Sequence, residues 1–166
     1  MPLLAWGRLD TLGLSRASGV LLSQDTVEIV DAGHPLAAGM TGHARVYRGP
    51  GKLSWGAAGE GASVVARSLE RGLPVVAHYP AGSMLPSGDR APADRVLFFL
   101  AGDGLAPWLI APEGYDLWLA AIDLLTGEAG AAGSAGAEDR AARSDHQVDA
   151  DGRGASGAVP APHVTR

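Results

Sequence analysis

Up to about residue 100, apolar residues occur in short runs that end at Gly or Pro and predict β-strands. The segment 26–31, TVEIVD, is rich in β-branched residues and alternates in polarity, so we expect a strand with Val27 and Ile29 on one face. Residues 63–69 are a further strand candidate. The apolar run 2–6 predicts a short buried strand that begins almost at the first residue.

A Gly-Pro-Gly sequence at 49–51 separates two further runs, 44–48 and 52–55. Glycine permits positive φ angles and proline fixes φ, a combination that is typical of tight turns. The sequence therefore predicts that the two flanking segments pair with each other as a hairpin.

The strongest strand signals are two continuous apolar runs, PVVAHY at 74–79 and RVLFFL at 95–100. Runs that do not alternate in polarity fit strands covered on both faces, as in the centre of a parallel sheet. Between them, residues 81–94 are rich in Gly, Pro and Asp, so we expect a loop there.

One helix is predicted over residues 112–126. Pro112 suits the first helical position, Glu113 complements the positive end of the helix dipole, and Gly127 stands where a C-terminal cap belongs. Ala111, just before the helix, is a poor N-cap. Apolar residues at helical spacing predict a stripe that packs on the sheet, formed by Tyr115, Trp118, Ile122 and Leu125.

Several strands followed by one helix predict an α/β domain. A parallel sheet needs helices on both of its faces, and the sequence supplies only one clear helix. Because helices are too few and a strand is expected from residue 2, we expect the sheet to be incomplete at its N-terminus.

The composition changes abruptly after Gly127. Residues 128–166 contain no Leu, Ile, Phe, Trp, Tyr or Met and consist mostly of Ala, Gly, Ser and charged residues. Such a segment cannot bury enough apolar surface to offset the entropy of ordering, about 1–2 kcal/mol per residue. The sequence therefore predicts one α/β domain over residues 1–127 and a disordered tail over residues 128–166.

Composition and charge argue against several kinds of function. The net charge is −5 and the basic residues are scattered singly, so no basic stripe is available for nucleic acid. The chain has no Cys, hence no disulfide, no thiolate metal ligand and no cysteine nucleophile. No stretch approaches the roughly 20 apolar residues needed to span a bilayer. The first ten residues lack the basic region of a signal peptide, and the compartment stays open.

Several short motifs resemble those of a known family in their order along the chain. The element HPLAAG at 34–39 is similar to one in ThuA-like domains of the trehalose-utilisation type, which are relatives of class I glutamine amidotransferases with a flavodoxin-like fold. The segment RVLFFLAGD at 95–103 resembles the strand near the end of such domains, and the helix at 112–126 lies where theirs does. The chain resembles still more an amidotransferase-like module of uncharacterised bacterial proteins, often exported. That module shares the PLLAW-like strand, the HPLAAG element, the pairs Trp55-Gly56 and Ala91-Pro92, and the FFL strand.

The resemblance covers about residues 1–127 and implies a flavodoxin-like sheet that this chain enters midway. It does not carry over a catalytic centre. The amidotransferase mechanism needs a Cys nucleophile activated by a His-Glu pair, whereas this chain has no Cys and no Glu follows His78-Tyr79-Pro80. The Gly-His pair that often follows the late strand of ThuA-like domains is also absent from residues 100–103.

Three residues are candidates for contact with a ligand: His34, His78 and Asp103. Asp31 precedes His34 by three positions, so a carboxylate and an imidazole are available there, although a strand-terminating turn explains the same residues. His78 stands at the end of one of the strongest strands and Asp103 just past the other, where open α/β sheets bind ligands. A packed histidine is the competing interpretation for His78. No third metal ligand stands at a suitable spacing, so we expect no metal, no cofactor and no catalytic residue.

Three functional hypotheses follow. The leading one is a non-catalytic, amidotransferase-like accessory domain that binds a ligand or a protein partner, such as the missing N-terminal half of its own fold. The second is a portion of a ThuA-like sugar-metabolism enzyme whose site is completed by upstream residues. The third is a non-functional fragment. The sequence does not identify the ligand.

Overall fold

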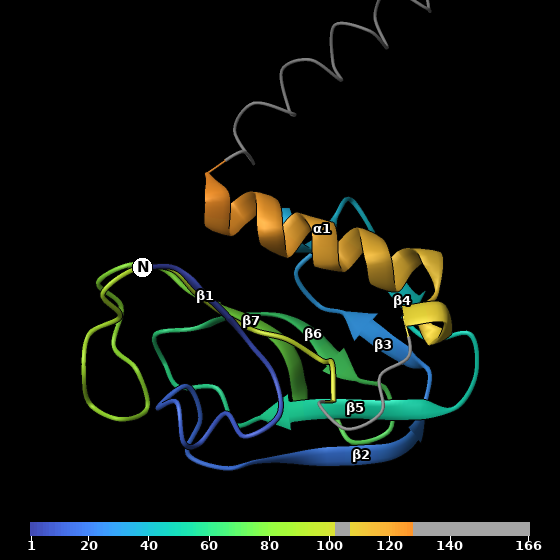
Figure 1. Cartoon of the computed structure of the whole chain (residues 1–166), viewed down its shortest axis with the longest axis horizontal. Helices are drawn as coiled ribbons and strands as arrows, with labels where there is room; N and C mark the ends of the chain where they lie inside the picture. The colour runs from blue at the N-terminus through green and yellow to red at the C-terminus, as the bar shows by residue number, and fades with distance from the viewer. Residues whose placement is uncertain (102–106, 128–166) are drawn as a thin grey trace, which may run out of the picture. The chain divides into compact units, whose positions relative to one another are not determined.

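The computed structural model describes residues 1–101 and 107–127, and Figure 1 shows their arrangement. The candidate residue Asp103 and the predicted disordered tail 128–166 lie outside these residues. The elements in chain order are β1 (Leu3–Ala5), β2 (Ser18–Gln24), β3 (Thr26–Ile29), the 3-10 helix η1 (Pro35–Ala37), β4 (Gly42–Arg45), β5 (Gly51–Gly56), β6 (Ser63–Ser68), β7 (Pro74–Tyr79), β8 (Arg95–Leu97), the 3-10 helix η2 (Pro107–Leu109) and α1 (Pro112–Thr126).

The larger sheet has the strand order β1-β8-β7-β6-β3-β4. Among its pairs, β1 and β8 run parallel, and the four other pairs are antiparallel. The domain is therefore α/β, with a mixed six-stranded sheet and one C-terminal helix. The predicted parallel setting of the runs 74–79 and 95–100 is wrong, because β7 and β8 pair directly with each other in antiparallel orientation, with Ala77 opposite Leu97.

A second sheet consists of β2 and β5, which pair antiparallel with Leu21 opposite Leu53. The predicted hairpin between 44–48 and 52–55 is wrong, because β4 pairs with β3 instead. The cause lies at Tyr47, whose backbone forms a bridge to Ile110 and whose buried ring packs under the turn. The Gly-Pro-Gly sequence thus leads the chain from one sheet to the other.

The continuous apolar run at 95–100 joins the two sheets. After β8, the Phe98 N–H donates to the Ala5 carbonyl (2.8 Å), and the Phe99 carbonyl then accepts from Ser54 N–H of β5 (2.7 Å). Both phenylalanines are fully buried. Because the run passes from one sheet to the other, both of its faces are covered, which explains why its polarity does not alternate.

The helix α1 ends as predicted. Gly127 has a φ of 82° and its N–H caps the Asp123 carbonyl, and no side-chain hydrogen bond caps the helix at Ala111. The helix packs on η1, β4 and β1, across one side of the larger sheet in Figure 1.

The predicted apolar stripe of α1 is confirmed in part, because Tyr115, Trp118 and Leu125 are partly buried against the core. The buried residues are Gly114, Leu117 and Ala121, while Ile122 is 38% exposed. Small residues let the helix approach closely, because a Cβ added at Gly114 would lie 2.4 Å from the Val46 carbonyl oxygen. Counting only large apolar residues therefore missed the small buried residues Gly114 and Ala121.

The strand predicted at 2–6 is present as β1, at one edge of the larger sheet. Its predicted burial is confirmed in part, because Ala5 is buried, Leu3 and Leu4 are half-buried, and Trp6, just after the strand, is 42% exposed. An edge strand is covered on fewer sides than a central one, which explains the difference.

Candidate functional site

The two candidate histidines, predicted separately, lie in contact. His34 Nε2 is 3.2 Å from His78 Nδ1, and the rings meet edge to face. His34 comes from the loop between β3 and η1, and His78 from the second-last position of β7. The fold therefore brings together two of the three sequence candidates.

A carboxylate extends this pair. His78 Nε2 lies 3.0 Å from Asp94 Oδ1, which also accepts the Ala81 N–H at 3.2 Å. Sequence reasoning missed Asp94, which immediately precedes β8. Its place beside His78 follows from the antiparallel pairing of β7 with β8, which sets the end of one strand beside the start of the next and which the sequence did not predict.

The sequence His-Pro explains the conformation at His34. A residue before proline is restricted to extended conformations, and His34 has φ −76° and ψ 139°. Pro35 occupies the first position of η1, and the His34 side chain caps this helix by accepting the Leu36 N–H at Nδ1 (3.1 Å). HPLAAG is thus a capped turn that buries Leu36 and Ala37.

The cap sets the direction of the hydrogen-bond chain. Since Nδ1 of neutral His34 accepts a backbone N–H, its proton is on Nε2 and is donated to His78 Nδ1. His78 is then protonated on Nε2 and donates to Asp94. All ring nitrogens of the two histidines are therefore engaged within the protein. We call these three side chains the His-His-Asp chain.

The His-His-Asp chain runs from His34, which is half-buried, through His78 to Asp94, which is more exposed. The His78 side chain is only 9% exposed, whereas the Asp94 side chain is 39% exposed. Burial lowers the pKa of His34, a charge on His78 would act in the same direction, and the Asp31 carboxylate opposes this shift. The predicted partnership of Asp31 with His34 is thus limited to this electrostatic effect and a backbone hydrogen bond of 3.3 Å.

The arrangement does not suit a metal ion. Metal ligands converge on one point, whereas His34, His78 and Asp94 are linked in series. Over residues 1–101 and 107–127, no group of three His, Asp or Glu side chains is placed to hold a metal ion.

Acidification is expected to destabilise the domain through His34. The unfolded chain regains the ordinary His pKa of 6.5, and the folded-state pKa is lower, so the unfolded state binds more protons below pH 6.5. The stabilisation from His34 is present above pH 6.5 and is lost as the pH falls towards the folded-state pKa. Urea unfolding from about pH 7.5 to 5 measures this loss.

The variant His34→Gln is the control for this pH dependence, because glutamine offers a donor and an acceptor but does not titrate in this range. The stability difference between wild type and His34→Gln should shrink as the pH falls. If both proteins lose the same unfolding free energy as the pH falls, His34 does not contribute to the pH dependence of stability.

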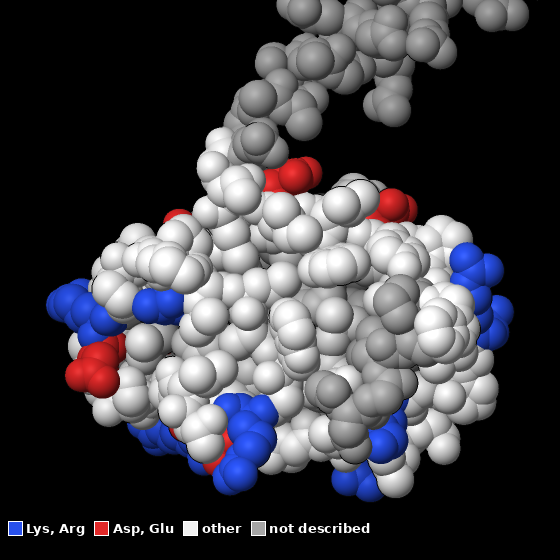
Figure 2. Space-filling model, in the orientation of Figure 1, with Lys and Arg blue, Asp and Glu red and all other residues white. Residues whose placement is uncertain are grey.

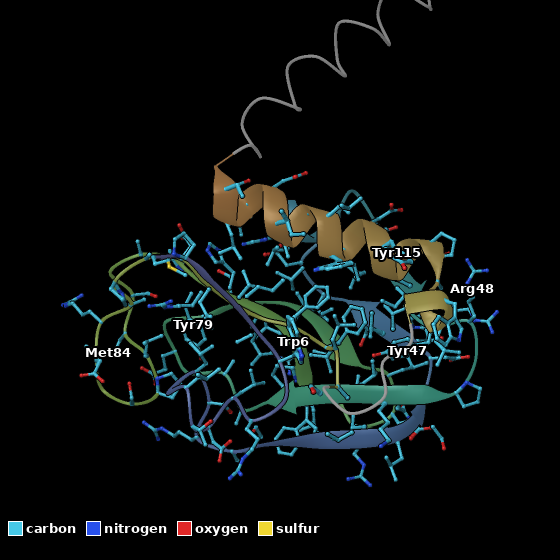
Figure 3. The ribbon with its side chains drawn as sticks, in the orientation of Figure 1. Trp6, Tyr47, Arg48, Tyr79, Met84 and Tyr115 are labelled. Atoms are coloured by element: carbon cyan, nitrogen blue, oxygen red, sulfur yellow. The ribbon has the colours of Figure 1, made fainter. Side chains whose placement is uncertain are left out.

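A separate hollow of about 340 Å³ lies beside the glycine-rich loop 57–61 and is also lined by Arg16 and residues 84–86. A Cβ at Gly61 would lie 2.3 Å from the Met84 carbonyl oxygen, so this glycine serves the close packing of two loops. Below the loop, the buried Tyr79 hydroxyl accepts the Gly59 N–H at 2.8 Å. Figure 3 shows Tyr79 and Met84 on the same side of the domain.

The surface has no dominant charged region in the face that Figure 2 shows, where Lys and Arg side chains stand apart from one another. Among the described helices, none is long and apolar enough to cross a membrane. Comparisons with protein-family models, curated proteins and solved structures found no match to this chain.

Proposed function

We propose that this chain is a non-catalytic accessory domain that acts by binding a protein partner. The observation that carries the proposal is the closed His-His-Asp chain. A general base needs a ring nitrogen within hydrogen-bond reach of its substrate. Here the Leu36 N–H, the neighbouring imidazole and the Asp94 carboxylate take up every ring nitrogen of His34 and His78.

The hydrogen bonds support a structural role for these residues. His78 joins the end of β7 to the start of β8 through Asp94, and to the turn at η1 through His34. Three segments distant in the sequence are thereby held together. A hydrogen-bonded polar network of this kind, with His78 buried at its centre, favours one arrangement of the segments over others.

The kinship with amidotransferase-like domains is part of this proposal. It rests on the order of the short motifs and is supported by the parallel pairing of β1 with β8, since flavodoxin-like sheets are parallel. The antiparallel pairs from β8 through β4 depart from that pattern. A loss of catalysis agrees with the absence of a Cys nucleophile.

Acylation of histidine by diethyl pyrocarbonate tests the closed chain, since the reagent attacks a free, neutral ring nitrogen. His43 is exposed on β4 and is the internal reference. We expect His34 and His78 to react at least roughly tenfold more slowly than His43 in the folded protein, because their nitrogens are hydrogen-bonded. Peptide mass spectrometry measures the rate of acylation at each histidine.

All three histidines should react alike after unfolding in urea, which controls for intrinsic differences. If either His34 or His78 reacts as fast as His43 in the folded protein, a ring nitrogen is available for chemistry. The proposal of a non-catalytic domain would then be wrong.

A further inference from the structure

The outer edge of β2 has no paired strand within residues 1–101 and 107–127. Among the described strands, β2 pairs only with β5, and it lies along the lower margin of the domain in Figure 1. Its sequence, SGVLLSQ, contains no charged residue and no proline, and Val20 and Leu22 are 41% and 65% exposed. Proteins usually protect such edges with charges, proline or short strands.

Of the three other edges of the described sheets, the one at β5 is covered by the segment after β8, where the Ser54 N–H donates to the Phe99 carbonyl. The edges at β4 and β1 are protected in the ways just named. At β4 the exposed side chains include His43 and the charged Arg45. At β1 the strand has only 3 residues and follows Pro2, which has no N–H to donate. β2, with 7 residues, is thus the edge best suited to pairing with another strand.

The hydrogen bonds within the β2–β5 sheet show which groups face outward. The Ala17 carbonyl accepts the Ala57 N–H at 2.8 Å, so residue 17 faces β5. In an antiparallel pair every second residue bonds to the neighbouring strand. The backbone N–H and C=O groups of Ser18, Val20 and Leu22 therefore face outward. The irregularity at Ser23, where φ is 58°, ends this regular edge.

We propose that β2 pairs antiparallel with β2 of a second copy of this chain, across a twofold axis at Val20. This deepens the proposed function by naming the partner, and it rests on that function. In this register Val20 lies opposite Val20 of the second copy, and Ser18 lies opposite Leu22. The outward backbone N–H and C=O groups of Ser18, Val20 and Leu22 then all have partners in the second copy. The exposed side chains of Val20 and Leu22 lie on the sheet that the two copies form together.

Charges at the two ends of β2 favour a second copy as the occupant. Arg16 precedes the strand and Asp25 follows it, and antiparallel pairing brings Arg16 of one copy next to Asp25 of the other. Asp10, bonded to Ser18 at one end, and Arg45, 3.7 Å from Asp25 at the other, also have opposite charges. The uncharged strand is thus flanked by self-complementary ends.

Analytical ultracentrifugation of the full chain tests the proposal. The wild type should be a closed dimer. Val20→Lys sets two like charges against each other at the axis and should weaken the dimer roughly tenfold or more. Leu69→Lys, at a site that is 45% exposed in the turn after β6, is the matched control and should leave the dimer unchanged.

Exchanging the two flanking charges tests the register. Arg16→Glu and Asp25→Arg should each weaken the dimer, because each sets like charges together at both ends of the pair. The double variant restores opposite charges and should recover most of the affinity. If the double variant loses as much dimer affinity as the two single variants together, residues 16 and 25 of the two copies do not interact.

The absence of Cys allows a direct distance test that also serves if Val20→Lys does not fold. A cysteine introduced by Val20→Cys faces its own copy at a Cα separation of about 5.5 Å, which suits a disulfide. Mild oxidation should give a covalent dimer of Val20→Cys but not of Leu69→Cys. A wild type that stays monomeric at about 100 μM, or equal cross-linking of both variants, would overturn the self-pairing of β2. If His34 and His78 in the same samples still react slowly with diethyl pyrocarbonate, the proposed function holds and the partner is a different protein.

Discussion

Replacing Phe99 with Ala is expected to lower the free energy of unfolding by about 3–5 kcal/mol. Phe99 is fully buried, and its ring lies 4.5 Å from that of Phe98 and 5.7 Å from that of Tyr47, measured between centroids. The loss combines the transfer of the ring to water with the cavity left at the junction of the two sheets. Urea unfolding at fixed pH measures it.

Leu119→Ala is the control for Phe99→Ala, because Leu119 is 54% exposed on α1. It should change the unfolding free energy by less than about 0.5 kcal/mol. A loss below about 1 kcal/mol for Phe99→Ala would contradict its position in the core.

Replacing Tyr79 with Phe is expected to cost about 1–3 kcal/mol although it removes a single oxygen atom. The buried hydroxyl donates to the Leu14 carbonyl at 3.0 Å and accepts the Gly59 N–H at 2.8 Å. Burial raises the pKa of Tyr79, so the hydroxyl keeps its proton to donate. Its removal leaves two backbone groups without this partner.

Thermal unfolding measures the cost of Tyr79→Phe, and Ser83→Ala is the control. The Ser83 hydroxyl donates to the Pro80 carbonyl at 2.7 Å in an exposed loop, where water replaces the lost bond. Amide exchange at Gly59 should speed up only in Tyr79→Phe. Equal stability losses in the two variants would show that the Tyr79 hydroxyl has no special role.

The sequence predicted those elements whose signals are local. The helix α1 has its proline at the start and its glycine at the end, and both limits match the structure. The strand at 26–29 and the run at 74–79 were also found, since each signal lies within the strand itself. Pairing was predicted less well, because it depends on segments distant along the chain. β5 pairs with β2, whose three consecutive apolar residues at 20–22 hide an alternation that the burial pattern reveals.

The candidate site was predicted in part for the same reason. His34 and His78 were chosen one at a time, and their contact depends on how the loop before η1 lies against β7. Asp94 was overlooked because a parallel sheet was expected, in which the end of one strand does not adjoin the start of the next. The structure does not describe Asp103, so its assignment stays a prediction.

The parallel pair of β1 and β8 has a consequence for the order of events during folding. Leu3 lies opposite Arg95, so β1 pairs, among the described strands, only with β8, which is synthesised much later. Contacts between such distant positions form slowly, because the intervening chain must be ordered first. On the ribosome, the backbone groups of β1 would lack their hydrogen-bond partners until β8 is synthesised. Chaperones that shield exposed strands would act during that interval.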